Sequence, residues 1–215
     1  MYKLGVIPAA GKGSRWGGYH KELLPCGSGR LLIDHTIEAM ALGGADAFLV
    51  VASREKIGTL ARHISQKHEG KQVYYAIQRG ANDIWSAIVE SFQIPADVYM
   101  FAMPDTLYSK SFFDFDMTSN FVLGLFTTEM PERFGTLRNR QIVNKEPGDD
   151  DSYMAWGTLV WSHECVQFWR AAQPENYTDA INRAIDKFGL HGIGMDFYHD
   201  MATYEDYHDY LLHSL

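Results

Sequence analysis

The residues that could carry chemistry begin directly after the first apolar run of the chain. The segment IPAAGKGSRWGGYHKELLP, residues 7–25, places Gly11, Gly13, Arg15 and Lys21 in one short loop. Glycines let backbone N–H groups turn toward an anion without obstruction by a Cβ atom, and the long basic side chains add positive charge. The chain as a whole has a formal net charge of −8, so this cationic loop is a local exception. The loop predicts a site for a small polyanion such as a chain of phosphates.

Two familiar phosphate-binding motifs do not match this loop. A P-loop requires G-x-x-x-x-G-K-[ST], whereas Lys12 is followed by Gly13. A dinucleotide fingerprint requires G-x-G-x-x-G, and Trp16 occupies the position of the third glycine. The acidic ribose partner of that fingerprint is also missing, because the next apolar run, AFLVVASR, ends in serine and arginine. The sequence therefore excludes both motifs.

Length and composition restrict the class of protein. With 215 residues, 46% of them hydrophobic, we expect one domain spanning residues 1–215 with a substantial core. The longest apolar runs are too short to cross a bilayer, and no signal-peptide pattern opens the chain. The two cysteines, Cys26 and Cys165, form no CxxC pair, which favours a cytoplasmic location. The acidic balance argues against nucleic acid as a partner, and the sequence leaves a homo-oligomer open.

The elements that must position the loop are indicated by alternating apolar runs and helical patterns. In the first hundred residues we expect strands at 3–9, 47–52, 72–78 and 97–103 and helices at 31–42, 54–67 and 82–92. Farther on we expect strands at 121–128, 134–138, 140–144, 154–161 and 190–198 and helices at 162–173, 177–188 and 203–214. The first half predicts a parallel sheet with helical crossovers. The fold class is thus a Rossmann-like three-layer α/β sandwich with a mostly parallel sheet and an added, partly antiparallel portion.

The loop and the segment behind it resemble one enzyme family. PAAGKGSR followed by KELLP is similar to the signature of nucleotidyltransferases that join a nucleoside triphosphate to a sugar 1-phosphate. The resemblance implies that the loop wraps the triphosphate, with Arg15 on the β- and γ-phosphates and Lys21 on the α-phosphate. It implies that Gln78, in IQRG, reads a pyrimidine base, although Asp83 stands where the family often has a glycine. The remaining nucleotide-binding residues that it implies are Ala9, Ala10, Gly11, Lys12, Gly13 and Ser14.

The same resemblance implies magnesium as the cofactor. It assigns one metal ligand to Asp105, which follows an apolar strand in MFAMPDTLY, and a second to Asp200 in FYHDMATYEDY. Asp196, four residues earlier, competes with Asp200 for this role. His199 is adjacent, but no second histidine or cysteine stands at zinc-ligand spacing, which favours a surface role.

Acceptor binding is implied for the second half of the chain. RFGTLR and MAWGTLVW resemble two acceptor strands of the family, which places Gly135 and Gly157 against the sugar. IVNKEP resembles a V-x-E-K-P segment with its last letters transposed. We expect Lys145 to hold the sugar phosphate, because Glu146 would repel it. The tryptophans of MAWGTLVW are interpreted as core residues.

The implied reaction is in-line attack of the acceptor phosphate on the α-phosphate, with release of pyrophosphate. Residues 1–105 would be the nucleotide-binding half and residues 106–215 the acceptor-binding half. Three alternatives stay open. They are a cytidylyltransferase acting on a polyol, isoprenoid-precursor or choline phosphate, a glycosyltransferase that uses the D-x-D string at 114–116, and a non-catalytic nucleotide sensor.

Overall fold

The computed structural model of the chain describes residues 1–27, 29–65, 67–81, 83–114, 117–146 and 153–214. The strands in these ranges are β1 (Lys3–Ala9), β2 (Ala47–Ala52), β3 (Lys67–His68), β4 (Lys71–Ile77), β5 (Val98–Ala102), β6 (Thr106–Tyr108), β7 (Phe121–Thr128), β8 (Gly135–Arg138), β9 (Gln141–Asn144), β10 (Tyr153–Ser162), β11 (Gly192–Gly194) and β12 (Tyr198–Asp200). The α-helices are α1 (Leu32–Leu42), α2 (Ile57–Ile64), α3 (Ile84–Ser91), α4 (His163–Ala172), α5 (Tyr177–Phe188) and α6 (Tyr204–Ser214). Short 3₁₀ turns are η1 (Ser14–Trp16), η2 (Lys21–Leu23), η3 (Lys110–Phe113) and η4 (Pro131–Arg133).

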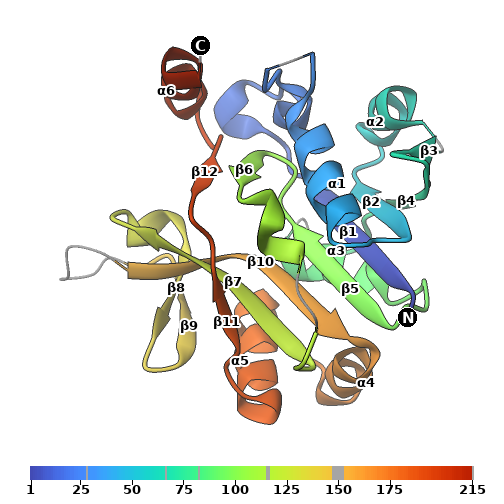
Figure 1. Ribbon diagram of the computed structural model, residues 1–215, viewed down its shortest axis with the longest axis vertical. Helices are drawn as coiled ribbons and strands as arrows, with labels where there is room; N and C mark the ends of the chain where they lie inside the picture. The colour runs from blue at the N-terminus through green and yellow to red at the C-terminus, as the bar shows by residue number, and fades with distance from the viewer. Residues whose placement is uncertain (28, 66, 82, 115–116, 147–152, 215) are drawn as a thin grey trace.

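A parallel core of four strands lies at the centre of the large sheet, in the order β5-β1-β2-β4 (Figure 1). The register pairs Ala9 of β1 with Ala52 of β2, and Ala52 with Ile77 of β4. The carboxyl ends of these strands therefore stop at one level. The loops that follow them open side by side, which is where open α/β sheets bind their ligands.

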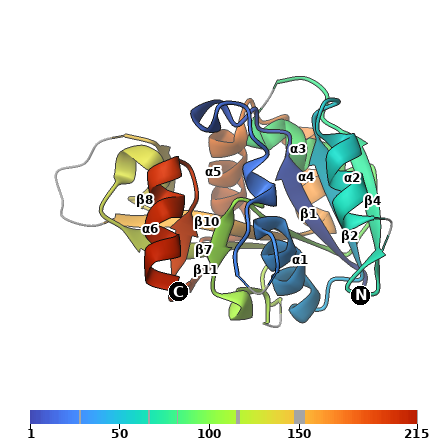
Figure 2. The same ribbon diagram turned by 90° about the horizontal axis from the view of Figure 1, so that it is seen from above.

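Helices cover both faces of this sheet, as the sequence predicts. Alternate residues of β2 point to opposite faces: Leu49 and Val51 belong to one buried cluster, and Phe48 and Val50 to the other. Side chains of α3, α4 and α5 complete the first cluster, and those of α1 and α2 complete the second. Figure 2 shows the helices on both sides of the strands. The three-layer sandwich is thus confirmed, and it explains why the core strands read as continuous apolar runs.

The predicted antiparallel portion is also confirmed. Strand β10 runs antiparallel to β5 on one side and to β7 on the other, and the β8–β9 hairpin attaches to β10. The expected single strand at 190–198 is wrong, because the structure has two short strands there, β11 and β12. The backbone N–H groups of Asp196 and Phe197 donate to Ser109 Oγ at 3.1 and 3.3 Å, which turns the chain between these two strands. Strand β12 then pairs with β6 as a separate two-stranded sheet.

The expected helix at 54–67 is shorter at both ends. The Ser53 hydroxyl accepts the backbone N–H of Lys56 at 3.3 Å, but helix α2 begins only at Ile57. The helix ends at Ile64 because Ser65 adopts a left-handed φ of 62°. Residues 67–77 form the β3–β4 hairpin, so Lys67 belongs to a strand and not to the helix.

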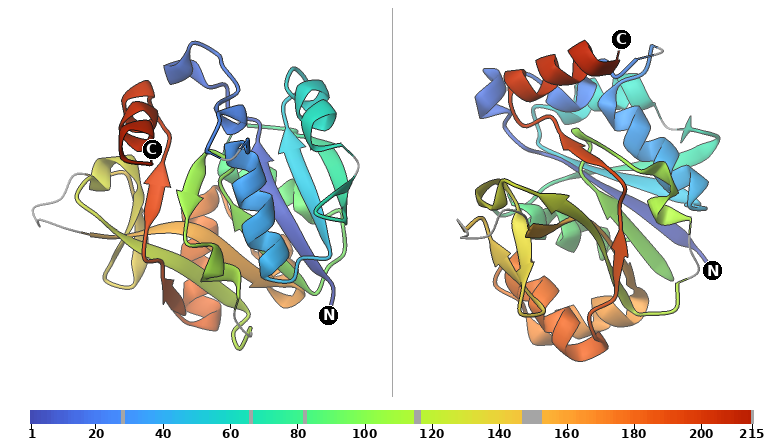
Figure 3. Two further views of the ribbon diagram at one scale, coloured as in Figure 1. Left: turned by 45° about the horizontal axis from the view of Figure 1, so that its top comes forward. Right: turned by 60° about the vertical axis from the view of Figure 1, so that its left-hand side comes forward.

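Helix α6 stands apart from the large sheet and lies beside the loop that follows β1 (Figure 3). Its first turn is capped as expected, since the N–H of Asp206 donates to Thr203 Oγ1 at 3.2 Å and the N–H of Thr203 donates to Asp206 Oδ2 at 2.8 Å. Trp16 packs into a third apolar cluster with Met201 and Tyr207. Among the described helices, none is both long and apolar enough to cross a membrane.

One pair of glycine substitutions tests the packing of the antiparallel portion. A Cβ at Gly124 of β7 would lie 1.9 Å from Thr158 Oγ1 and 2.7 Å from the Phe112 ring, so Gly124→Ala should destabilise the fold by about 1–3 kcal/mol. The matched control is Gly58→Ala in α2, where nothing lies within 4 Å and alanine should stabilise the helix by about 0.5–1 kcal/mol. Urea unfolding measures both, and equal shifts of the two midpoints would contradict the packing described for β7.

Candidate active site

The glycine loop after β1 is a tight turn that bonds to itself. The N–H groups of Trp16 and Gly18 both donate to the carbonyl of Gly13, at 2.8 and 3.0 Å. Gly13 has a left-handed φ of 59°, and a Cβ there would lie 2.4 Å from the carbonyl oxygen of Tyr19. Gly11 has no such constraint, because nothing lies within 4 Å of its Cβ position. The turn therefore needs glycine at position 13, whereas position 11 is left open toward solvent.

Helix α6 holds this loop in place from the other end of the sequence. The Trp16 indole N–H donates to the carbonyl of Met201 at 3.2 Å, and its ring meets the rings of Tyr204 and Tyr207 edge-on. The Tyr207 hydroxyl donates to the carbonyl of Pro25 at 2.7 Å. The loop is therefore held at two places: at the turn after Gly13, through Trp16, and at the segment after Lys21, through Pro25.

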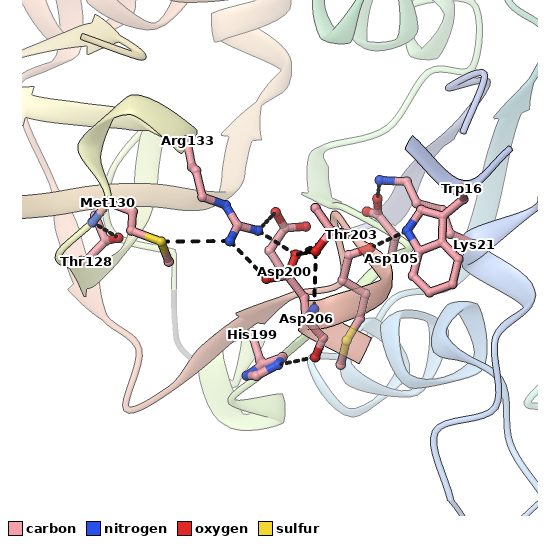
Figure 4. A network of polar contacts seen from close by, with 11 residues as sticks. Trp16, Lys21, Asp105, Thr128, Met130, Arg133, His199, Asp200, Thr203 and Asp206 are labelled. Carbon is pink, nitrogen blue, oxygen red and sulfur yellow. Dashed lines mark hydrogen bonds and ion pairs between the residues drawn. The ribbon is translucent and has the colours of Figure 1, made fainter. Parts of the chain in front are cut away.

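Lys21 forms an ion pair with Asp105, directly behind strand β5 (Figure 4). Asp105 is only 4% exposed, and its second oxygen, Oδ1, is buried with no hydrogen-bond partner among the described residues. Burial opposes the charged form of Lys21, but the charge of Asp105 and its hydrogen bond, together with the charge of Asp200, raise the pKa of Lys21 above its ordinary value. The ammonium group therefore stays positive.

Asp200 is brought to the same place by the β6–β12 pairing. The register sets Asp200 opposite Thr106, the residue after Asp105, although 95 positions separate the two aspartates in the sequence. Burial, together with the negative charge of Asp105, raises the pKa of Asp200 to about 6. The two predicted metal ligands are therefore electrostatic neighbours.

Arg133, the first residue of the segment RFGTLR, was not predicted as a site residue. It donates two hydrogen bonds to Asp206, at 2.9 and 2.8 Å, and lies 3.4 Å from Asp200 Oδ2 (Figure 4). Burial opposes ionisation of Asp206, but the hydrogen bonds from Arg133 and Thr203 lower its pKa overall. A signal was present in the sequence: a basic residue immediately before the segment FG.

A second buried ion pair fixes the segment that carries Lys21. Its neighbour Glu22 is 2% exposed, and the Lys56 ammonium, which is 5% exposed, donates to both Glu22 carboxylate oxygens at 2.9 and 3.1 Å. Lys56 comes from the β2–α2 connection, so this pair ties the first loop to the second. The sequence offers no signal for the pair, because its members are 34 residues apart.

Three hollows run across this edge of the sheet and share lining residues. The Gln78 hollow, of about 640 Å³, lies between the glycine loop and Gln78, and the central hollow, of about 160 Å³, lies beneath the loop. The Gly135 hollow, of about 190 Å³, lies between Asp105 and Gly135. Gln78 lines the first two hollows, and Lys21 and Asp105 line the last two. The three hollows therefore form one continuous row.

The nucleotide-side residues that the sequence predicts are distributed over the first two hollows. Gln78 donates through Nε2 to the carbonyls of Ala81 and Asp83 at 2.8 and 3.0 Å, so its amide also shapes its own loop. Asp83, which replaces a family glycine, accepts the N–H of Ser86 at 2.7 Å and caps helix α3. The hollows are lined by Ala10, Lys12 and Gln78 in the first and by Ala9, Ala10, Gly11 and Gln78 in the second. Gly13 and Ser14 lie in the turn itself, and Ser14 is exposed.

The Gly135 hollow brings together most of the residues predicted for catalysis and acceptor binding. They are Arg15, Lys21, Asp105, Gly135, Lys145, Gly157 and Asp200. Both glycines are required by packing, because a Cβ at Gly157 would lie 2.2 Å from the Tyr198 ring and one at Gly135 would lie 2.4 Å from Trp156 Nε1. Lys145 has a left-handed φ of 51°, a conformation that is uncommon outside glycine and often found at functional sites.

Some candidate residues lie elsewhere. Asp196 is exposed and lines none of the three hollows, so Asp200 is the better placed of the two competitors. The D-x-D string falls partly outside the described residues, since positions 115–116 are not among them. The segment PGDDDS at 147–152, which the sequence predicts to be a loop, lies wholly outside them. Within the described ranges, no group of three His, Cys, Asp or Glu side chains is arranged to hold a metal by itself.

The buried Glu22–Lys56 pair gives a testable prediction. Lys56→Met leaves the Glu22 carboxylate buried without a partner and should destabilise the fold by about 3–5 kcal/mol. The double variant Glu22→Gln with Lys56→Met removes both charges and should recover most of that loss. Urea unfolding of the two single variants and the double variant measures the coupling. Additive losses would show that the ion pair does not hold the loop.

Part of the sequence matches a known protein family. The family model described as MobA-like NTP transferase domain matches residues 5–108, just under half of the chain, which include the glycine loop, Lys21 and Asp105. No curated protein sequence gives a significant match.

Solved structures match nearly the full length. A protein from Bacillus anthracis assigned as a glucose-1-phosphate thymidylyltransferase, in complex with sucrose, is 20% identical with a TM-score of 0.84, covering 99% of this chain and 95% of its own. A UDP-glucose pyrophosphorylase complexed with UDP-glucose is 18% identical with a TM-score of 0.83, over 100% and 98% of the two chains. The inositol-1-phosphate CTP transferase from T. maritima is 16% identical with a TM-score of 0.74, over 100% and 95%. At these identities the likeness is one of fold.

The family match and the shared fold agree with the motif in the first loop. The resemblance drawn from PAAGKGSR and KELLP is confirmed. Residues 5–108 match the MobA-like NTP transferase domain, and this match together with the shared fold supports an enzyme of the nucleotidyltransferase type.

Proposed function

We propose that this nucleotidyltransferase joins a pyrimidine nucleoside triphosphate to a sugar 1-phosphate, giving a nucleoside-diphosphate sugar and pyrophosphate. One observation carries the proposal: Arg15, Lys21 and Lys145 line a single hollow together with the carboxylates of Asp105 and Asp200. The reaction must bring two polyanions together, so its main barrier is electrostatic. A chain of net charge −8 can lower that barrier only by concentrating cations at one place.

The chemistry needs no nucleophilic side chain. An oxygen of the acceptor phosphate attacks the α-phosphorus, and a new P–O bond forms as the bond to the oxygen that bridges the α- and β-phosphorus breaks. That oxygen leaves on pyrophosphate with the bonding electrons. In this proposal Lys21 neutralises the α-phosphate, Arg15 the departing phosphates, and Lys145 the acceptor phosphate. Catalysis then comes from positioning and charge stabilisation.

The carboxylates at the site fit a magnesium ion. Asp105 Oδ1 is buried with no protein partner among the described residues, and Asp200 lies across the β6–β12 pair from it. Carboxylate oxygens are hard ligands of the kind that Mg²⁺ prefers, and the ion usually completes its shell with waters and substrate phosphates. Asp105 and Asp200 would hold the ion, which would supply positive charge to the reacting phosphates.

The nucleotide would occupy the Gln78 and central hollows. These hollows follow the carboxyl ends of β1, β2 and β4, and Gln78 faces the loop that carries Gly11. The acceptor would occupy the Gly135 hollow, on the other side of Lys21. This arrangement agrees with a nucleotide-binding half at residues 1–105 and an acceptor-binding half at residues 106–215.

A cytidylyltransferase for a non-sugar phosphomonoester is the second candidate. The structure of an inositol-1-phosphate CTP transferase covers the whole of this chain at a TM-score of 0.74, so the fold accommodates a polyol phosphate in a relative. The two candidates share the nucleotide side and the chemistry. They differ only in the body of the acceptor, which makes the acceptor the quantity to measure.

The direct test is pyrophosphate release over a matrix of substrates. The common nucleoside triphosphates are combined with sugar 1-phosphates, inositol 1-phosphate and choline phosphate, each with magnesium and with excess chelator. We expect release from one preferred pair, abolished by the chelator and restored by added Mg²⁺. Nucleotide binding without release over the whole matrix would instead support the nucleotide sensor and overturn the proposal.

Two substitutions test the assigned charges. Lys21→Ala and Asp105→Asn should each lower the turnover number by about 10²–10³-fold, because each removes one group that stabilises the charge of the transition state. Lys187→Ala and Asp186→Asn make the same chemical changes at exposed positions of α5 and should leave turnover unchanged. Circular dichroism confirms folding of all four variants. Near-native rates in the first two would refute the assignment.

A further inference from the structure

The Gly135 hollow contains a buried donor that the proposed reaction does not use. Trp156 is 6% exposed and lines this hollow, and its indole Nε1 has no hydrogen-bond partner among the described residues. A buried N–H without a partner destabilises the fold, so native proteins usually satisfy such groups. Two other indoles follow the rule: Trp16 donates to Met201 and Trp169 donates to Ala180.

The local backbone brings this indole to the wall of the hollow. Strand β10 pairs regularly with β7 up to Trp156, where the register shifts before Thr158. Such irregularities bend a strand and redirect a side chain, and they are common beside active sites. The irregularity falls at Gly157, which itself lines the same hollow. The position of the Trp156 side chain therefore depends on this register shift and not only on the regular alternation of side chains along the strand.

Gly135 allows the backbone of β8 to lie close to the indole N–H. A Cβ at position 135 would lie 2.4 Å from Trp156 Nε1, so a larger residue there would cover or displace the donor. Both Gly135 and Trp156 line the hollow. The absence of a side chain at position 135 and the unsatisfied donor thus occur at the same point of the wall.

The groups around the hollow separate by chemistry. The basic side chains of Arg15, Lys21 and Lys145 would bind phosphate, whereas Trp156 stands with other aromatic rings, its own ring 5.6 Å from that of Tyr177. Rings with a neutral donor suit an uncharged, hydroxyl-bearing body rather than a second charged group. At about 190 Å³ the hollow is below the ~300–1,000 Å³ typical of drug-sized ligands, so that body must be small.

We propose that the Trp156 indole N–H is a specificity determinant that donates a hydrogen bond to a hydroxyl oxygen of a small, polyhydroxylated acceptor phosphate. The proposal rests on the proposed function and adds to it the group that reads the acceptor body. Both tryptophans of MAWGTLVW were expected to be core residues rather than sugar platforms. Both are buried, but Trp156 also lines the hollow, whereas Trp161 is stacked on Tyr99 at 5.5 Å. The Trp161 indole nitrogen also has no partner among the described residues, but this residue lines none of the three hollows.

The two tryptophans therefore provide a matched pair of variants. Trp156→Phe and Trp161→Phe each remove one buried, unpartnered indole N–H and keep an aromatic ring. With the best substrate pair of the matrix, Trp156→Phe should raise the KM for the acceptor by about 3- to 10-fold, the loss of one neutral hydrogen bond, and leave the KM for the nucleotide unchanged. Trp161→Phe should change neither KM. The proposal would be overturned if Trp156→Phe had the same turnover number and the same acceptor KM as the wild-type protein.

A binding experiment separates this proposal from the proposed function. Indole ¹⁵N–¹H resonances of ¹⁵N-labelled protein are recorded with glucose 1-phosphate, inositol 1-phosphate or inorganic phosphate, and the signal missing from Trp156→Phe identifies that residue. The Trp156 signal should move with at least one of the two polyhydroxylated phosphates and stay in place with inorganic phosphate. A stationary signal at saturating concentration of both would refute the role of Trp156. Absence of pyrophosphate release while the signal moves would refute the proposed function alone.

Discussion

The carboxylates of Asp105 and Asp200 are held close together by the short β6–β12 ladder, and the rest of the site depends on neutralising them. Burial of Asp200, together with repulsion from the negative charge of Asp105, raises the pKa of Asp200 to about 6. Each aspartate forms an ion pair with a cation: Asp105 with Lys21, and Asp200 with Arg133. One of these cations comes from the first loop of the chain and the other from a turn more than a hundred residues later. Because these cations pair with the two carboxylates, the positive charge that a polyphosphate would need lies at one place.

Helix α6 holds the segments that carry these cations in fixed positions. A loop rich in glycine has little order of its own, because glycine loses more conformational entropy on folding than any other residue. The loop is held through Trp16, whose indole bonds to the backbone beside α6, and through the Tyr207 hydroxyl on Pro25. Asp206 of the same helix forms an ion pair with Arg133. The glycine loop and the turn that carries Arg133 thus both contact the α6 region, which fixes their positions relative to each other.

Local patterns in the sequence were sufficient for the layers of the fold and for part of the site. Long apolar runs and helical periodicity located the sheet and its covering helices, and the glycine loop with Lys21 indicated phosphate binding. Patterns of this kind do not extend to strands of three residues, which have too few positions to show a period, so β6 was missed and β12 was merged with β11. They also do not reveal ion pairs such as Glu22 with Lys56, because the pairing depends on the packing of two separate loops.

The acceptor side shows why the family motif does not identify the substrate. The resemblance implies that Gly135 and Gly157 let the sugar approach the backbone. In the structure each glycine makes room first for an aromatic ring, that of Trp156 or Tyr198, and those rings form part of the wall of the hollow. The backbone positions are therefore compatible with many acceptors, while the shape and the donors of the hollow are set by side chains outside the motif. If the acceptor is a small polyol phosphate as proposed, its discrimination from a hexose phosphate would come from these rings, because the cations around them would recognise only the phosphate that all such acceptors share.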